Sequence, residues 1–308
     1  MIVGIPKEIK EDEKRVSLLP HLIKPIIALG HKVIIQSNAG KASGFSNDIY
    51  INEGAEVLPK LSDIYSKADL IIKVKEPLEE ELSLIRKSQI IFTFFHFGGN
   101  EKLLKSFLKT KATAIAYETV EDHKGNLPLL SPMSEIAGRM AVLNGAKFLE
   151  GTYKGKGKLL SGVPGVEPGT ITIIGGGIVG MNAAKIASGL GAKVNILDIN
   201  IDTLRFLDNI MPSNVITYHS NTHNINKLLP DTDLLIGAVL VPGEKAPKII
   251  NKKKLTLMKR GSVVVDVAVD QGGCIETTKP TTHKNPIYSV DGIIHYCVAN
   301  MPGAVPKT

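Results

Sequence analysis

Residues 170–185 read TITIIGGGIVGMNAAK, a β-branched apolar run followed by a glycine-rich turn and a stretch of small residues. Gly175, Gly177 and Gly180 have the spacing GxGxxG. In this pattern the first glycine permits a tight turn, the second lets the backbone approach a pyrophosphate, and the third lets helix and strand pack closely. The phosphates then lie at the positive amino end of the helix. The stretch therefore predicts a strand, turn and helix that bind a dinucleotide.

An acidic residue follows where ribose recognition requires one. The next apolar run, Lys193–Leu197, ends in Asp198, at about the 20-residue distance that the dinucleotide-binding pattern prescribes. A carboxylate there accepts hydrogen bonds from the ribose hydroxyls and repels a 2′-phosphate. A plain glycine turn with a capping aspartate is the purely structural alternative. The combination favours NAD over NADP.

Outward from this turn, short apolar runs alternate with helical stretches along the whole chain. Parallel strands that are buried on both faces explain why the runs do not alternate polar with apolar residues. The expected strands are Ile2–Ile5, Lys32–Gln36, Ala68–Val74, Gln89–Phe94, Ala112–Tyr117, Thr170–Ile174, Lys193–Leu197, Val215–His219, Asp233–Val239, Ser262–Val267 and Pro286–Val290. The expected helices are Leu18–Leu29, Leu61–Ser66, Glu79–Ile85, Glu101–Leu108 and Glu135–Leu149.

These elements predict an α/β protein with two doubly wound parallel-sheet domains. A chain of 308 residues is long for one core, so two domains are expected. The turn-rich segment Gly125–Pro132 marks a boundary near residue 130. We expect a substrate and catalytic domain over residues 1–129 and a Rossmann dinucleotide-binding domain over residues 130–308.

Composition excludes several classes of function. The 37 basic and 30 acidic residues give a net charge of +7, but the basic residues are scattered and form no nucleic-acid reader motif. The longest apolar runs are too short to span a membrane, and the amino-terminal residues do not resemble a signal peptide. Two cysteines are too few for a disulfide framework or a cysteine-rich metal site. We expect a cytoplasmic protein that binds no nucleic acid and no membrane, and no metal site is predicted.

Three side chains of the first domain are candidates for substrate chemistry. Lys75 and His96 each follow an apolar run, and Arg15 lies in the charged loop after the first run. All three are therefore expected beyond the carboxyl ends of parallel strands, where ligands bind in open α/β sheets. Arginine binds a carboxylate through two parallel hydrogen bonds, lysine polarises a carbonyl oxygen, and histidine exchanges a proton near neutral pH. Taken singly, each is more often a surface or packing residue.

The second domain contributes an acidic candidate. Asp270 follows the run Val263–Val269, at the end of a predicted strand, where its carboxylate can reach a ligand. Asp266 lies inside the same run and is expected to be a buried hydrogen-bonding group. Asp270 is therefore the acidic candidate of the second domain for contact with a ligand.

A succession of longer motifs covers essentially the whole chain. They are Gly4-Ile-Pro-Lys-Glu with Arg15-Val16, Lys73-Val-Lys-Glu-Pro, Ser131-Pro-Met-Ser-Glu-Ile-Ala-Gly-Arg-Met, Gly175-Gly-Gly-Ile-Val-Gly-Met-Asn-Ala-Ala-Lys, Asp266-Val-Ala-Val-Asp-Gln-Gly-Gly and Asn300-Met-Pro-Gly-Ala-Val-Pro. Such a succession is far more specific than any one motif. In these motifs the chain resembles the alanine dehydrogenase family.

The resemblance implies a role for each candidate. Arg15 and Lys75 bind the carboxylate and the carbonyl oxygen of the substrate, and His96 and Asp270 are catalytic; which of these two is the principal base stays open. The resemblance implies an NAD site lined by Ser134, Ile178, Val179, Asp198, Ser220, Val239, Leu240, Val267, Ala268, Val269, Val298, Ala299, Asn300 and Met301, besides the three motif glycines. The implied reaction is the reversible, NAD-dependent oxidative deamination of L-alanine to pyruvate and ammonium. The implied assembly is a homo-hexamer.

Two alternatives and one departure accompany this interpretation. The NAD-binding component of a proton-translocating transhydrogenase shares the two-domain plan, but it needs no substrate-binding pair such as Lys75 and His96. A non-catalytic NAD-binding protein is the other alternative. The chain ends at Thr308, directly after Asn300–Pro306, where members of the family continue with a helical segment that returns to the first domain. From this departure we expect either an interrupted reading frame or a need for another polypeptide to complete the fold.

Overall fold

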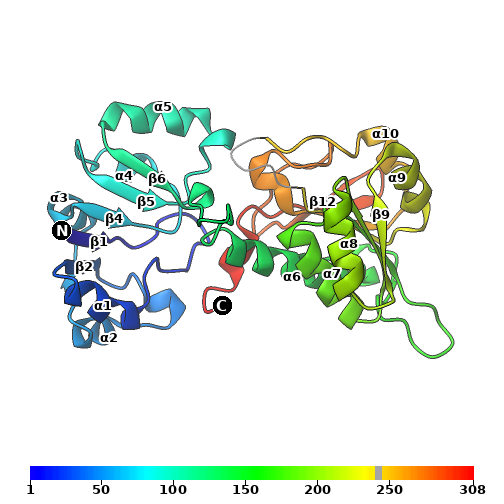
Figure 1. Ribbon diagram of the computed structural model, residues 1–308, viewed down its shortest axis with the longest axis horizontal. Coiled ribbons are helices and arrows are strands. Elements are labelled where there is room, and N and C mark those ends of the chain that lie inside the picture. The colour runs from blue at the N-terminus through cyan, green and yellow to red at the C-terminus, as the bar shows by residue number, and fades with distance from the viewer. Residues whose placement is uncertain (240–244) are drawn as a thin grey trace. The chain divides into compact units, whose positions relative to one another are not determined.

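The computed structural model describes residues 1–239 and 245–308, and its chain divides into two compact units (Figure 1). The first unit comprises Met1–Leu130 together with Gly303–Thr308, and the second comprises Ser131–Pro302. No helix among the described residues is both long and apolar enough to cross a membrane.

The first unit is built on a six-stranded parallel sheet with the order β3-β2-β1-β4-β5-β6. Its strands are β1 (Ile2–Ile5), β2 (Lys32–Gln36), β3 (Glu56–Leu58), β4 (Leu70–Ile72), β5 (Ile90–Thr93) and β6 (Thr113–Ala116). The direction in which successive strands are added reverses between β1 and β4. In sheets of this kind the reversal point opens a crevice beyond the carboxyl ends of the two strands.

Both faces of this sheet are covered, which explains the uninterrupted apolar runs. On β2, Val33 and Ile35 belong to one buried cluster and Ile34 belongs to the other. Neighbouring residues of a strand point to opposite faces, so a strand between two apolar layers needs apolar residues throughout. The helices of the unit are α1 (Ile23–Ala28), α2 (Asn47–Asn52), α3 (Leu61–Lys67), α4 (Glu79–Leu82) and α5 (Glu101–Thr110).

The second unit has a seven-stranded sheet with the order β12-β13-β11-β10-β7-β8-β9. Its strands are β7 (Thr170–Ile174), β8 (Lys193–Asp198), β9 (Val215–His219), β10 (Leu234–Gly237), β11 (Val263–Asp266), β12 (Ile287–Val290) and β13 (Ile293–Tyr296). The edge strand β12 runs antiparallel to β13, and the other neighbours pair in parallel. Here the order reverses between β7 and β10, which places a second crevice beside the glycine-rich turn.

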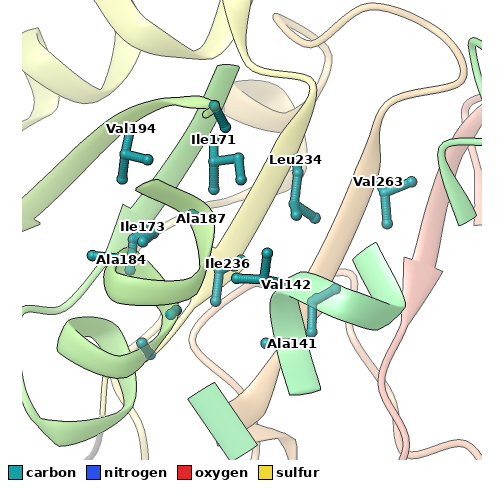
Figure 2. Packing of buried hydrophobic residues seen from close by; sticks show 14 of the residues in the cluster. Ala141, Val142, Ile171, Ile173, Ala184, Ala187, Val194, Leu234, Ile236 and Val263 are labelled. Carbon is teal, nitrogen blue, oxygen red and sulfur yellow. The ribbon is translucent and has the colours of Figure 1, made fainter. Parts of the chain in front are cut away.

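Two helices with small residues cover one face of the second sheet. Figure 2 shows Ala141 and Val142 of α6 (Ser131–Phe148) and Ala184 and Ala187 of α7 (Ile178–Gly189) among the strand residues of this core. The opposite face packs against α9 (Thr222–Leu228) and α10 (Lys252–Leu255), and α8 (Ile201–Ile210) follows β8. Small side chains let helix and sheet backbones approach, which fixes α7 closely behind the glycine-rich turn.

The predicted strands are confirmed to within two residues at each end. The predicted α/β class with two doubly wound sheets is also confirmed. Six helices and strands of the described chain were missed, namely α2, β3, α8, α9, α10 and β13. The expectation of parallel sheets is wrong for β12, because a tight turn at Asp291 and Gly292, both with positive φ, joins it to β13 as a hairpin. The helix expected from residue 135 begins earlier, at Ser131, since Pro132 suits the first turn of a helix.

Candidate active site and dinucleotide site

The glycine-rich turn of the second unit has the conformation that its sequence predicts. Gly175 has φ of +105°, and a methyl group there would lie 2.6 Å from the carbonyl oxygen of Ala238, which follows β10. A methyl group at Gly180 would lie 1.8 Å from the carbonyl oxygen of Gly175. Only glycine therefore fits at the first position, where φ is positive, and at the third, where helix meets strand.

The middle glycine leaves open space at the helix end. Gly177 is the N-cap of α7, and a methyl group placed on it would meet no described atom within 4 Å apart from its own neighbours in the chain. The first amide groups of a helix have no partner inside the helix and point outward. An open backbone position at the amino end of a 12-residue helix fits the pyrophosphate of a dinucleotide.

Asp198 is fixed at the carboxyl end of β8 beside this turn. Its Oδ2 accepts a hydrogen bond from the amide of Gly176 at 2.7 Å, and its Oδ1 accepts one from the amide of Asn200 at 2.8 Å. The carboxylate is half-buried. Each oxygen keeps a lone pair for a further donor, as ribose recognition requires.

The other predicted cofactor residues of the second unit lie at or near the same edge of its sheet. Val239 follows β10, and its amide nitrogen would be 3.1 Å from a methyl group at Gly175. Ser134 lies one helical turn before Gly138. A methyl group added at Gly138 would lie 2.2 Å from the carbonyl oxygen of Val179. The amide of Ser220 bonds to the carbonyl of Asp198. The remaining predicted positions are Ile178 at the start of α7, Val267, Ala268 and Val269 after β11, and Val298, Ala299, Asn300 and Met301 after β13. Leu240 lies outside the described residues.

The two aspartates near the end of β11 differ as expected. Asp266 is fully buried and accepts hydrogen bonds from the hydroxyl of Thr278 at 2.7 Å and from the amides of Ala268 and Ile275. Burial raises the pKa of its carboxyl group, against the lowering effect of these bonds. Asp270 is exposed and accepts one bond from the amide of Asn300 at 3.3 Å. Asp266 is thus a structural group, and Asp270 is accessible to a ligand.

In the first unit, hydrogen bonds join the segments that carry the three predicted side chains. The hydroxyl of Ser17 donates to the carbonyl of Ile72 at 2.7 Å, which ties the loop of Arg15 to the end of β4. The hydroxyl of Thr93 donates to the carbonyl of Lys75 at 2.8 Å, which ties Lys75 to the end of β5. The structure therefore brings the Arg15, Lys75 and His96 segments to one edge of the sheet, at and beside its reversal point.

Arg15 is held by a neighbouring carboxylate. Its Nε donates to Oε1 of Glu13 at 2.8 Å and its NH2 nitrogen donates to Oε2 at 2.6 Å. Glu13 is buried, and 12% of the Arg15 side chain is exposed. A two-point contact of this kind fixes the plane of a guanidinium group, so Arg15 is oriented by the protein itself.

A buried ionic cluster lies beneath Lys75, which is itself buried. The ammonium of Lys73 donates to Glu81 at 2.6 Å and to Glu8 at 3.3 Å, and the hydroxyl of Tyr65 also donates to Glu81. The other oxygen of Glu8 accepts the amide of Val74 at 2.7 Å. The cluster joins the segment after β1 to the segment after β4, and so fixes the backbone that leads to Lys75.

His96 follows β5 in a left-handed backbone conformation, with φ of 52° and ψ of 38°. Its ring is half-buried and stacks on Phe94, with 5.8 Å between ring centroids and 6° between the planes. Its amide donates to Oε1 of Glu118 at 2.6 Å. The backbone and the ring of His96 are thus both supported by neighbouring groups.

Several residues that support this site could not be identified as functional from the sequence alone. Three glutamates support predicted residues or their neighbours: Glu13 contacts Arg15, Glu81 contacts Lys73, and Glu118 contacts His96. None of these glutamates lies in a motif from which a function was predicted. The motif Gly4-Ile-Pro-Lys-Glu contains Glu8, whose strand-end position was the one available signal. Within the described residues, no group of three or more His, Cys, Asp or Glu side chains is arranged to hold a metal ion.

The two sheets and the glycine-rich turn define a two-domain α/β protein with a Rossmann-type dinucleotide-binding domain. Family models describe the same two parts: residues 4–137 match the alanine dehydrogenase/PNT N-terminal domain and residues 141–308 match the C-terminal domain. The chain belongs to the alanine dehydrogenase/PNT family.

Individual relatives agree with this assignment. The chain is 51% identical to alanine dehydrogenase of Methanococcus maripaludis and 50% identical to that of Bacillus subtilis, over all of this chain and 83% and 81% of those proteins. A solved L-alanine dehydrogenase superposes with a TM-score of 0.92 at 49% identity, covering 100% of this chain and 85% of that one. A transhydrogenase from Sinorhizobium meliloti has a TM-score of 0.82 at 25% identity, covering 100% and 88%. These values favour the dehydrogenase branch of the family over the transhydrogenase branch.

Proposed function

We propose that this protein is an NAD-dependent L-alanine dehydrogenase, which converts L-alanine, NAD and water into pyruvate, ammonium, NADH and a proton. The observation that carries the proposal is the presence of Arg15, Lys75 and His96 on three segments that meet at one sheet edge. Identity of about half to alanine dehydrogenases over the whole chain supports the choice of substrate.

Arg15 and Lys75 bind and polarise the substrate in this proposal. Arg15 binds the substrate carboxylate through its guanidinium group, and so orients the α-carbon. Positioning of this kind contributes roughly 7–11 kcal/mol in favourable systems. The ammonium of Lys75 stabilises the negative charge that develops on the substrate oxygen as the carbinolamine and the ketone interconvert.

His96 and Asp270 transfer protons in this proposal. A base takes the proton of the substrate ammonium group and releases it to solvent. NAD bound at the glycine-rich turn would supply the hydride acceptor for the α-carbon. Water then adds to the resulting iminium carbon as its proton passes to the base. The carbinolamine collapses to pyruvate, and the nitrogen leaves with a proton as ammonia, which becomes ammonium. General acid–base catalysis is typically worth about 10²–10⁴ in rate, so His96→Gln and Asp270→Asn should each lower kcat.

The first experiment is NADH oxidation by the purified protein with pyruvate, in the presence and in the absence of ammonium. We expect oxidation that depends on both pyruvate and ammonium. A folded protein that binds NADH but does not oxidise it would support the non-catalytic alternative instead. Transfer of hydride to a second nucleotide, without a need for pyruvate, would support the transhydrogenase alternative.

Replacing Arg15 by lysine tests the proposed carboxylate contact. Lysine keeps the charge but loses the planar fork. A charge-assisted hydrogen bond contributes about 1.5–3 kcal/mol, so we expect KM for pyruvate to rise roughly 10- to 100-fold. KM for NADH should stay within about twofold, because Arg15 is proposed to bind the substrate carboxylate and not the dinucleotide. The exposed neighbour Lys14 provides the control, and an unchanged KM in Arg15→Lys would remove Arg15 from the substrate site.

We also propose that the protein assembles into a homo-hexamer, as family membership suggests. Light scattering of the purified protein after size-exclusion chromatography measures the assembly directly. A mass of six chains is expected, and a monomer at working concentration would contradict the proposal.

A further inference from the structure

The backbone conformation of His96 requires support. A positive φ is uncommon for residues other than glycine, and His96 has φ of 52° and ψ of 38°. The strand before it ends at Thr93, so the ladder of β5 does not fix this residue. A neighbouring group must therefore stabilise the turn at His96.

Glu118 provides this support. Its Oε1 accepts the amide of His96 at 2.6 Å and its Oε2 accepts the amide of Phe95 at 3.2 Å. The carboxylate is buried, at 7% exposure of the residue. Two amides that converge on one carboxylate form a small anion-binding concavity, and here the anion is part of the protein.

The register of the sheet explains why Glu118 reaches these amides. β5 and β6 are parallel neighbours, with Thr93 opposite Ala116. Glu118 lies two residues beyond Ala116, in a short 3-10 turn over Tyr117–Thr119. The turns after the two strands therefore run side by side, and the side chain of one bonds to the backbone of the other.

The residue before Glu118 supports the imidazole ring through a second contact. The ring of Tyr117 packs edge-on against Phe94, with 5.0 Å between centroids and 88° between planes, and Phe94 stacks on His96. Burial, and secondarily the charge of Glu8, raises the pKa of the Tyr117 hydroxyl. Tyr117 therefore stays neutral and acts by packing, while Glu118 acts on the backbone.

We propose that Glu118 is a positioning residue for catalysis, which holds the His96 backbone in its left-handed conformation and thereby sets the direction of the imidazole. The inference deepens the proposed function, since it depends on His96 being the acid–base group. Glu118 itself transfers no proton in the reaction. Its contribution should therefore appear in turnover and in the mobility of the turn, and much less in cofactor binding.

The test compares Glu118→Gln, Glu118→Ala and the control Glu121→Gln, an exposed glutamate three residues further on. Glutamine keeps the shape but presents an NH₂ group to one of the two amides. A misplacement of about 1 Å can lower a rate roughly 10²-fold, so we expect kcat of Glu118→Ala to fall by about that factor. KM for NADH should stay within about twofold of the wild type.

Two further measurements separate positioning from a general loss of structure. Hydrogen–deuterium exchange of the peptide around Phe94–Asn100 should accelerate in both Glu118 variants and stay unchanged in Glu121→Gln. One limb of the pH profile of kcat should disappear in His96→Gln. The same limb should be displaced along the pH axis in Glu118→Gln. The exchange result needs no turnover, so it still tests the contact if the wild type proves inactive. Unchanged exchange around Phe94–Asn100, or kcat of both Glu118 variants within threefold of the control, would overturn the proposal.

Discussion

Replacing Lys73 by methionine is expected to lower the free energy of unfolding by about 3–5 kcal/mol, the range found when one partner of a buried ion pair is removed. Lys73 has no exposed surface, and it is the ammonium partner of the carboxylates of Glu8 and Glu81. Methionine fills similar space but leaves two buried carboxylates facing each other. Because the cluster joins the β1 and β4 segments, the loss should also displace Lys75 and lower activity.

The pH dependence of this variant follows from the pKa shifts in the wild type. Burial disfavours the charged form of Lys73, but the carboxylates of Glu8 and Glu81 outweigh that effect and raise its pKa. Burial raises the pKa of Glu8, although the charge of Lys73 lowers it in part. Without Lys73 the Glu8 pKa should rise further. A carboxyl group whose pKa is raised on folding binds more protons in the folded state, so it favours folding at low pH and opposes it as pH increases.

The instability of Lys73→Met should therefore be smaller near pH 5 than near pH 8. Circular dichroism during urea unfolding at both values measures it, and the chain contains no tryptophan that could serve as a probe. Lys102→Met is the control, because its ion pair with Glu79 is more than four-fifths exposed on both sides and such pairs contribute about 0–1 kcal/mol. A loss below about 1 kcal/mol in Lys73→Met would mean that the cluster is dispensable for stability.

The sequence was informative where the chemistry is local. The glycine-rich turn, Asp198 and the strand before each are close together in the chain, and each needs a particular residue for a steric or electrostatic reason. Gly180 illustrates this, since the close approach of Gly175 excludes any side chain there. The same reasoning located Arg15, Lys75 and His96 at strand ends, because parallel strands place their carboxyl ends at one edge.

The supporting groups were not predictable because their partners are distant in the chain. Lys73 and Glu8 are 65 residues apart, and His96 and Glu118 are 22 residues apart. Nothing in either local sequence fixes which strand neighbours which, and the bond from Glu118 depends on the register of β5 with β6. The missed strands β3 and β13 span three and four residues, which is too short for a periodic pattern to stand out.

Alanine substitutions at Gly180 and Gly177 should separate the structural from the ligand-binding function of the glycine-rich turn. A methyl group at Gly180 would lie 1.8 Å from a backbone oxygen, so helix α7 must move. We expect the free energy of unfolding of Gly180→Ala to fall by about 1–3 kcal/mol, as it does in overpacked cores. NADH binding should be lost as well, because the helix end that binds it is displaced. At Gly177 the described chain leaves open space and φ is −68°, so Gly177→Ala should fold as stably as the wild type.

Gly177→Ala should nevertheless bind NADH at least about tenfold more weakly, because its methyl group occupies the space through which the backbone approaches a pyrophosphate. Gly189→Ala is the matched control on the same helix, at an exposed position with open space around it in the described chain. Calorimetric titration with NADH and thermal unfolding of all three variants give the two readouts. If Gly177→Ala bound NADH as tightly as Gly189→Ala, the pyrophosphate would not lie against this turn. The open space at the start of α7 would then need another explanation.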